Sequence, residues 1–287
     1  MSDVETRQLR YFVALAEELH FGRAALRLGM AQPPLSRAIR QLESHLGVRL
    51  LERTTRQVSL TTAGEGFLRD ARVALDAIGA ATQRAKHAGR STPTLRVALK
   101  ADYDGGLLPQ ILAVFERDAA ALPVELVMGG RDEQAPSLLD GRADVAMLPA
   151  PFAERGLDFE PLVTEPRLVA LAANDPLADR PNLRLADLAG RELPDGTPAD
   201  NEAAGPGCRR TNLDLAQIMS LTELGSVVWF PPVSVARRHP RPGIAYREVS
   251  GLAPFTFMVA WPRDSRSPAV AAFVRAATAV AAEPVAS

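Results

Sequence analysis

The residues best suited to recognition chemistry form a polar set between positions 32 and 44. They carry amide, hydroxyl and guanidinium groups at helical spacing: Gln32, Ser36, Arg37, Arg40 and Ser44. Arginine and glutamine can make paired hydrogen bonds to base edges in the major groove of DNA, and hydroxyl groups can bind phosphate. The same residue types are also typical of a solvated helix face. The polar set alone therefore leaves both interpretations open.

An apolar stripe would hold this polar set in place. Its members recur at intervals of four, three and four residues: Leu35, Ile39, Leu42 and Leu46. This period predicts an amphipathic helix. Pro33 and Pro34 fit only its first turn, because proline lacks the backbone N–H that later turns require. Gln32 would then stand at the N-terminal end of the helix.

Two shorter helical patterns precede this helix. We expect helices over Thr6–Leu19 and Phe21–Leu28, each with apolar residues on one face. Gly29 suits the position just after a helix C-terminus. Only three residues then separate Gly29 from Pro33, which is the spacing of a helix-turn-helix.

A period of two follows the third helix and predicts a small β-hairpin. Apolar and polar residues alternate at Val48, Leu50, Val58 and Leu60. The tip would carry Arg53, Thr54 and Arg56, which suit contact with DNA phosphates beside a recognition helix. A charged turn that protects an exposed sheet edge is the alternative.

Residues 62–88 form one long helical pattern, about 40 Å at 1.5 Å per residue. We expect it to begin with a capping box formed by Thr62 and Glu65. Small and apolar residues recur along it as a heptad seam: Phe67, Ala71, Ala74, Ile78, Ala81 and Ala85. A small winged domain cannot bury so long a seam, so we expect this helix to pair with a second copy of itself. Packing on the rest of the chain is the alternative.

Composition and charge narrow the class of protein. The chain has 287 residues and a formal net charge of −1, but residues 1–90 carry +5 and the remainder −6. The positive charge of residues 1–90 is typical of a domain that binds a polyanion. Cys208 is the single cysteine, so no intrachain disulfide can form, and we expect a reducing, cytoplasmic location. No signal peptide or membrane-spanning segment is expected, and so no membrane partner.

After a break at residues 89–94, the pattern changes to short apolar strands alternating with helices. We expect strands at 95–101, 124–128 and 143–148, with helices at 106–119 and 133–139. This order favours an α/β domain with parallel strands. Ligands of such domains bind beyond the carboxyl ends of the strands.

Residues 1–90 resemble the DNA-binding region of LysR-type transcriptional regulators. The resemblance is gapless and rests on these segments: Leu9-Arg10-Tyr11-Phe12-Val13, Phe21-Gly22-Arg23-Ala24-Ala25, Ala31-Gln32-Pro33-Pro34-Leu35-Ser36-Arg37, Leu50-Leu51-Glu52-Arg53-Thr54 and Leu60-Thr61-Thr62-Ala63-Gly64. It implies a mainly α winged helix-turn-helix at 1–61, a linker and dimerisation helix at 62–88, a hinge at 89–94 and an effector-binding domain at 95–287. Double-stranded DNA, a small-molecule effector and RNA polymerase are the implied partners, and the implied assembly is a homodimer or homotetramer.

The resemblance also assigns roles to particular residues. DNA contacts are implied for Gln32, Pro33, Ser36, Arg37 and Arg40, and on the wing for Arg53, Thr54 and Arg56. The effector domain would be α/β, similar to type II periplasmic binding proteins, with one subdomain at 95–166 and 263–287 and a second at 167–262. The outgoing crossover would be 167–173 and the return 255–262.

Candidate effector-binding residues follow from the predicted strand ends and the comparable loops of the second subdomain. They are Asp102, Tyr103, Gly129, Met147, Pro149, Thr197 and Trp229. The family usually has small hydroxyl residues after the first strand, whereas this chain has Asp102 and Asp104. These carboxylates would favour a cationic or hydroxyl-rich effector, unless both face solvent. The segment 193–207, rich in glycine, proline and acidic residues, suggests a shortened second subdomain.

The sequence gives little support to the hypothesis that the protein is an enzyme. It contains no nucleophile elbow, phosphate-binding loop, dinucleotide fingerprint or metal-binding motif, so we expect no catalysis, cofactor or metal. An enzyme fused to a winged helix and a bare ligand-binding protein are the alternatives. Cys208 could sense oxidants, but no partner cysteine is available to it.

Overall fold

The computed structural model describes residues 4–53, 58–89, 91–130, 132–200 and 213–283. The chain divides into two compact units, the first made mainly of residues up to 90 and the second of residues from 91 onward. Each unit has its own apolar core. Among the described residues, no helix combines the length and the hydrophobicity that a transmembrane span requires.

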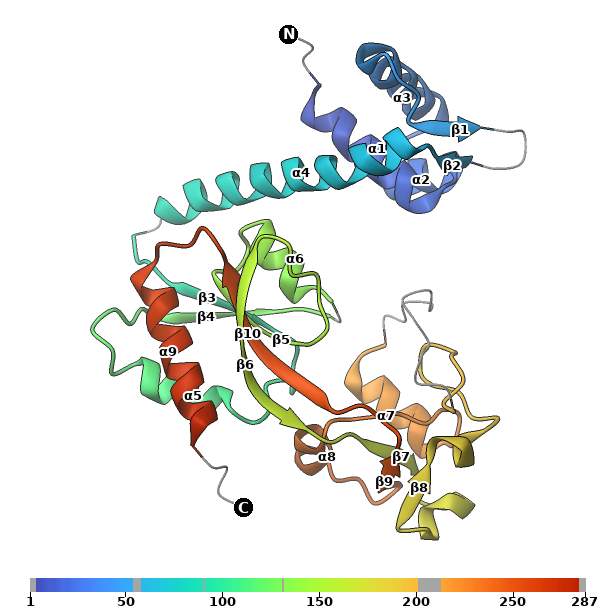
Figure 1. Ribbon diagram of the computed structural model, residues 1–287, viewed down its shortest axis with the longest axis vertical. Coiled ribbons are helices and arrows are strands. Elements are labelled where there is room, and N and C mark those ends of the chain that lie inside the picture. Colours follow the sequence, from blue (N-terminus) through green and yellow to red (C-terminus); the bar gives the residue numbers. More distant parts are fainter. Residues whose placement is uncertain (1–3, 54–57, 90, 131, 201–212, 284–287) are drawn as a thin grey trace. The chain divides into compact units, whose positions relative to one another are not determined.

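The first unit is mainly helical (Figure 1). Its elements are α1 (Thr6–Glu18), α2 (Phe21–Arg27), α3 (Gln32–Leu46), β1 (Leu51–Arg53), β2 (Val58–Leu60) and α4 (Thr62–Ala88). The core joins the apolar faces of the first three helices with the hairpin, through Phe12, Leu15, Leu35, Ile39 and Leu42 among others. The three predicted helices and the predicted hairpin are therefore present.

Helix ends in this unit follow local backbone chemistry. Leu19, at the C-terminal end of α1, has a φ of 48°, while Gly29 and Gly47 have φ values of 65° and 69° after α2 and α3. Left-handed conformations of this kind end helices, and glycine adopts them without steric cost.

Helix α4 spans the predicted residues, but its N-terminal cap differs from the prediction by one residue. The cap is Thr61, whose Oγ1 accepts a hydrogen bond from the Gly64 N–H at 2.9 Å. Thr62 is already helical, so the expected Thr62–Glu65 capping box is wrong. Two adjacent threonines fit the same cap pattern, and Thr61 takes the role because its hydroxyl also donates to the Arg49 carbonyl oxygen at 2.8 Å.

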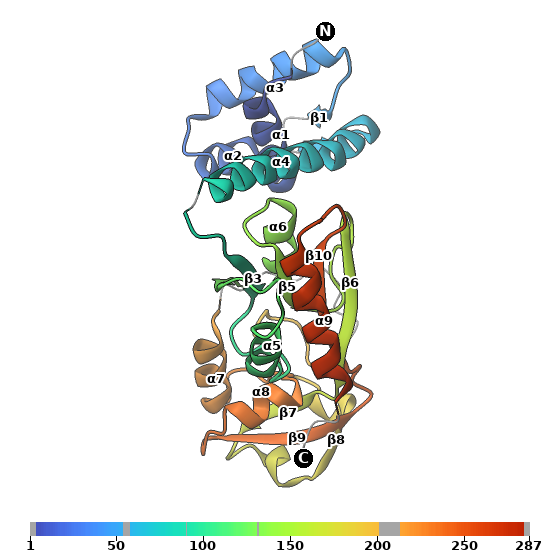
Figure 2. The ribbon, with the colours of Figure 1, turned by 90° about the vertical axis from the view of Figure 1, so that its left-hand side faces the viewer.

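The second unit is built on a five-stranded sheet in the order β4-β3-β5-β10-β6. Its strands are β3 (Leu95–Leu99), β4 (Val124–Met128), β5 (Val145–Pro149), β6 (Leu157–Glu165) and β10 (Phe255–Pro262). β3 is parallel to β4 and β5, and β10 is antiparallel to β5 and β6. Three helices lie beside this sheet (Figures 1 and 2): α5 (Leu108–Phe115), α6 (Gln134–Leu139) and α9 (Pro268–Ala282).

A smaller three-stranded sheet, in the order β7-β9-β8, forms the second subdomain. Its strands are β7 (Leu168–Ala172), β8 (Asn182–Arg184) and β9 (Ile244–Ser250), and its helices are α7 (Leu215–Glu223) and α8 (Val233–Arg238). Single 3₁₀ turns at Pro176–Asp179 and Leu185–Leu188 flank β8. The core of this subdomain includes Val169, Leu171, Leu183, Leu188 and Val228.

The boundary between the two subdomains differs from the prediction. Residues 255–262, expected to be a return crossover in the second subdomain, form β10 between β5 and β6 of the large sheet. Strand β6, which we did not expect, is the edge partner of β10. Its apolar pattern is interrupted at Glu160 and Pro161, so the antiparallel partner rather than a clear period of two defines it. The chain passes to the small sheet after Glu165 and returns before Phe255.

Candidate nucleic-acid interface and effector domain

The exposed face of α3 carries the side chains predicted to read DNA. Gln32, Pro33, Arg37 and Arg40 are exposed and Ser36 is half-buried. On the opposite side, Leu35, Ile39 and Leu42 have no exposed surface. Among the described residues, no carboxylate pairs with Arg37. An arginine on an anchored helix, without an acidic neighbour to neutralise it, is suited to bind a base edge or a phosphate.

Several contacts fix α3 within the first unit. The Met30 N–H donates to the Ala25 carbonyl oxygen at 3.0 Å and so closes the turn between α2 and α3. Glu43 accepts hydrogen bonds from the backbone N–H groups of Leu50 and Leu51 at 3.0 and 3.1 Å. Glu43 therefore ties the hairpin to α3, a positioning role that its place on a polar helix face did not reveal.

The wing is described only at its base. β1 pairs with β2 in antiparallel register, with Leu51 opposite Leu60 and Arg53 opposite Val58. Thr54 and Arg56 lie outside the described residues, as does the side chain of Arg53. Their contact with DNA remains a prediction.

The seam of α4 has two parts. Phe67 packs edge-to-face on Phe12 of α1, with ring centroids 5.1 Å apart, and Ala71 is only 2% exposed. These two residues pack inside the first unit, which the seam prediction did not anticipate. Further along, Ala74 is half-buried, Ala81 is exposed and Ile78 is 40% exposed.

Charged residues reinforce the joint between α4 and the helix-turn-helix. Glu17 of α1 accepts a hydrogen bond from Arg72 of α4 at 2.7 Å and pairs with Arg27 of α2 at 2.7 Å. Partial burial of Glu17 opposes its ionisation, but the hydrogen bonds from Arg72 and Arg27 outweigh it and lower the pKa of this carboxyl. A single carboxylate thus links three helices.

In the second unit, two of the candidate effector residues lie together. Tyr103, after β3, and Trp229, before α8, are 6% and 5% exposed and belong to one apolar cluster with Ile218, Met219 and Phe257. The cluster joins side chains of both subdomains. It therefore fills the junction where strand ends of the large sheet meet the small subdomain.

The other candidates lie elsewhere in the unit. Met147 is fully buried in the core beneath the large sheet, so its side chain is structural. Thr197 sits in a local turn, where its hydroxyl donates to Asp195 at 2.6 Å. Gly129 directly follows β4 and Pro149 is the last residue of β5, and both are half-buried. Residues 201–207 of the expected irregular segment, and Cys208, lie outside the described residues.

The two carboxylates after β3 are paired within the chain. Arg238 Nη1, at the end of α8, donates to Asp104 Oδ1 at 2.9 Å and to Asp102 Oδ1 at 3.3 Å. His239 Nε2 lies 3.1 Å from Asp102 Oδ2. The carboxylates therefore do not simply face solvent, because a cation of this chain pairs with both. The preference for a cationic or hydroxyl-rich effector stays a prediction.

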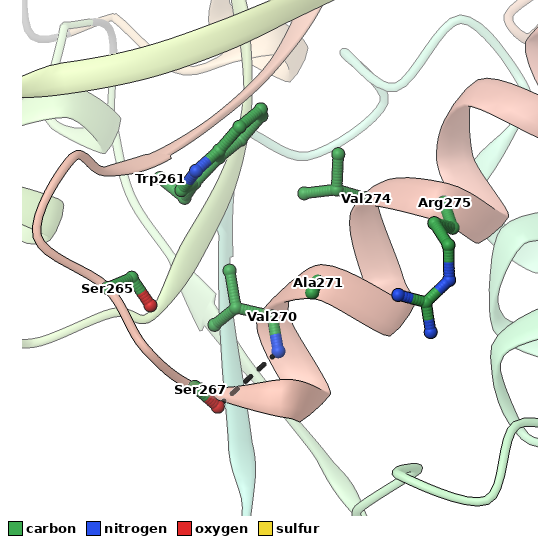
Figure 3. Close-up of a pocket in the computed structure, with 7 residues that line it drawn as sticks. All are labelled: Trp261, Ser265, Ser267, Val270, Ala271, Val274 and Arg275. Carbon is green, nitrogen blue, oxygen red and sulfur yellow. Dashed lines mark hydrogen bonds between the residues drawn. The ribbon is translucent and has the colours of Figure 1, made fainter.

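A shallow pocket of about 220 Å³ lies between the end of β10 and α9. Trp261, Val270 and Val274 provide most of its apolar wall, as Figure 3 shows. Arg275 at its rim is paired with Asp118 at 2.8 Å. None of the candidate effector residues lines this pocket. No cluster of potential metal ligands occurs among the described residues.

The fold and the exposed face of α3 define a class. A winged helix-turn-helix, a long helix and a two-subdomain α/β domain together make a DNA-binding regulator with its own ligand-binding domain.

Comparisons with known proteins identify the family within this class. The model described as "Bacterial regulatory helix-turn-helix protein, lysR family" matches residues 6–65, and "LysR substrate binding domain" matches residues 88–282. The chain belongs to the LysR family of bacterial transcriptional regulators. It is a DNA-binding regulator with an effector-binding domain.

Individual relatives agree with this assignment. The regulator AlsR of Bacillus subtilis is 32% identical over 94% of each chain, and the Hca operon activator HcaR of Escherichia coli is 30% identical over 94% of this chain and 96% of its own. Full-length CbnR, solved in complex with its target DNA, is 31% identical with a TM-score of 0.52, over 97% of this chain and 100% of CbnR.

Proposed function

We propose that two copies of this chain bind an inverted-repeat promoter site, each placing α3 in a major groove. The observation that carries this proposal is the division of α3 into two faces. One face is anchored by fully buried Leu35, Ile39 and Leu42, and the other exposes Gln32 and Arg37. The similarity to CbnR, which has been solved with its target DNA, supports DNA binding by this chain.

Within the interface, we assign different roles to different side chains. Arg37 and Gln32 read base edges, because both can make two hydrogen bonds to one base. Ser36 and the wing residues Arg53 and Arg56 bind phosphates and hold the helix in register. Pro33 and Arg40 flank the reading residues and contribute secondary contacts.

The dimer forms through the outer part of α4. Ile78 is 40% exposed on this helix, more than its apolar side chain would be in a completed core. Pairing of two such helices would bury it and set the two α3 helices about 34 Å apart, one turn of DNA. Two dimers can assemble further into a tetramer.

The second unit binds a small-molecule effector. Binding must stabilise one arrangement of the dimer over another, because only a difference in affinity can shift an equilibrium. RNA polymerase is the proposed further partner on the promoter. Since the target is chromosomal DNA, we place the protein in the bacterial cytoplasm, and we assign it no catalytic activity, in line with relatives named as transcriptional regulators.

Selection of DNA fragments by the full-length protein tests this proposal. Fragments recovered over several rounds from genomic DNA at moderate salt should share an inverted repeat with half-sites one helical turn apart. The region upstream of the chain's own gene is the first candidate to examine. Recovered fragments with no common sequence, or with a single unpaired half-site, would contradict it.

A further inference from the structure

Helix α8 is held at both ends by residues of the large-sheet subdomain. At its first turn, the Ser234 N–H donates to Glu165 Oε2 at 3.0 Å, and the Ser234 hydroxyl also binds that carboxylate. At its last turn, Arg238 binds Asp102 and Asp104. Between these ends, Val235 is buried in the apolar cluster that contains Tyr103 and Trp229. This short helix is therefore a joint between the two subdomains.

The loop that supplies Asp102 and Asp104 has a constrained backbone. Asp102, Gly105 and Gly106 have φ values of 63°, 62° and 77°. A non-glycine residue at positive φ carries a conformational cost, which persists where surrounding contacts impose it. A Cβ at Gly105 would lie 2.9 Å from Val163 Cγ1, so this part of the loop lies directly against β6.

The same loop approaches the arginine closely. A Cβ at Gly106 would lie 3.9 Å from Arg238 Nη2. The loop is thus fixed on the large sheet, and it presents its carboxylates to α8 of the small subdomain.

The two ion pairs differ in how much they depend on Arg238. The Asp104 side chain is 6% exposed, whereas that of Asp102 is 29% exposed. Asp104 also accepts a hydrogen bond from the Gly106 N–H at 3.1 Å. A buried carboxylate that loses its cationic partner is strongly destabilised, because water cannot fully replace the partner. Arg238 and Asp104 therefore depend on each other more than an exposed surface pair would.

We propose that the ion pairs of Arg238 with Asp102 and Asp104 form a latch between the two subdomains of the effector domain. The strength of this latch sets how readily the subdomains separate. An effector that enters the junction only when they separate must supply the free energy lost from the latch, so the latch raises the effector concentration needed for a response. This proposal concerns the second unit alone, so it can be refuted without affecting the DNA-binding proposal.

The chain contains a reporter for this latch. Trp229 is one of two tryptophans and lies in the apolar cluster at the junction, while the other, Trp261, lies at the end of β10. In a Trp261→Phe background, the fluorescence of the full-length protein reports on Trp229. Amide hydrogen exchange of residues 100–106 and 233–239 reports local opening of the loop and of α8.

We expect Arg238→Gln to shift the Trp229 emission to longer wavelength and to speed exchange in both segments about tenfold or more. Arg237→Gln, at the neighbouring exposed arginine, should leave both readings unchanged. Unchanged emission and exchange in a folded Arg238→Gln protein would overturn the proposal.

Coupling between the partners gives a second test. Asp104→Asn should speed hydrogen exchange in the same segments as Arg238→Gln. The double variant should exchange no faster than the faster single variant, because both substitutions break the same Arg238–Asp104 ion pair. Fully additive effects would overturn the proposal. Should Arg238→Gln or Asp104→Asn fail to fold, Asp102→Asn at the more exposed partner provides the test, with an expected few-fold rise in exchange. No rise would count against the latch.

Discussion

At the scale of single residues, recognition depends on side chains whose charge is left available by their surroundings. Arg37 is exposed on α3 and has no carboxylate partner among the described residues, whereas Arg238 is held by two carboxylates. Both are arginines on helices, and their sequence contexts alone do not distinguish them. The difference arises from residues far away in sequence.

Arg37→Ala should weaken binding to a selected operator by about 1–3 kcal/mol and relax its sequence preference. Arg37→Lys keeps the charge but loses the paired geometry, so it should retain affinity for random DNA while losing preference for the operator. Fluorescence anisotropy on both DNAs measures the two effects. Equal losses on operator and random DNA for both variants would assign Arg37 to phosphate contact instead.

The pKa of Glu17 leads to a prediction about pH. Because its pKa is lowered in the folded state, the ionised carboxylate stabilises the fold above its unfolded pKa of about 4.3, and this contribution is lost as the pH falls through the folded value. Glu17→Gln should therefore cost about 0.5–1 kcal/mol at pH 7, as for a partly exposed pair. The difference from wild type should shrink in urea melts at progressively lower pH, below about pH 4.3. A difference independent of pH would show that packing, not charge, is responsible.

At the scale of elements, the first turn of α4 lies directly against the backbone at the start of the hairpin. A Cβ at Gly64 would lie 2.0 Å from the Leu50 carbonyl oxygen, whereas a Cβ at Gly66 would have no neighbour closer than 3.7 Å. The two glycines look alike in the sequence. Only the approach of the hairpin, which is a tertiary contact, separates them.

Opposite effects are expected from alanine at these two positions. Gly64→Ala should lower stability by about 1–3 kcal/mol, because the backbone of the hairpin would have to move. Gly66→Ala should raise it by about 0.5–1 kcal/mol, since alanine favours an open helical position. Thermal melts of the two variants give the comparison, and effects of the same sign would contradict the close approach of α4 to the backbone of Leu50, just before β1.

The outer part of α4 provides a second prediction at this scale. Ile78→Asp should dissociate the dimer in sedimentation experiments, because a charge would be buried in the helix pair. Val73→Asp is the matched control, since Val73 is 39% exposed and lies five residues away, about 140° around the helix. A mass unchanged by Ile78→Asp, or equal dissociation by both, would argue against a seam through Ile78.

Local signals in the sequence predicted the elements of the first unit well. The bounds of α4 agree at both ends, and the apolar periods of α1 and α3 correspond to their buried faces. Apolar spacing and helix-ending glycines are short-range features, so they can be read without the fold. The exchange of Thr62 for Thr61 as the cap shows the limit of that approach, because the choice depends on a hydrogen bond to Arg49.

Long-range pairing accounts for what the sequence did not predict in the second unit. β10 lies between two strands that precede it by about a hundred residues, and no local period shows which sheet it joins. The same applies to Asp102 and Asp104, whose partner lies more than 130 residues away. Their type and position pointed to the junction, but not to a cation of the same chain.

At the scale of the whole molecule, the two units carry different chemistry. The first 90 residues have a net charge of +5 and include α3, which exposes Arg37 and Arg40, while the rest of the chain carries −6. A basic unit attracts the DNA backbone, and an acidic remainder discourages the second unit from binding it nonspecifically. This separation allows DNA binding and effector binding to be varied independently by mutation.

Hydroxyl-radical footprinting of the full-length protein on a selected operator tests the central claim most directly. The account predicts two protected segments about one helical turn, or roughly 10 base pairs, apart on one face of the duplex. Both should be lost together in Ile78→Asp at a concentration that saturates the wild-type protein. Protection of a single segment, or of two segments that Ile78→Asp leaves intact, would contradict recognition by a paired α3.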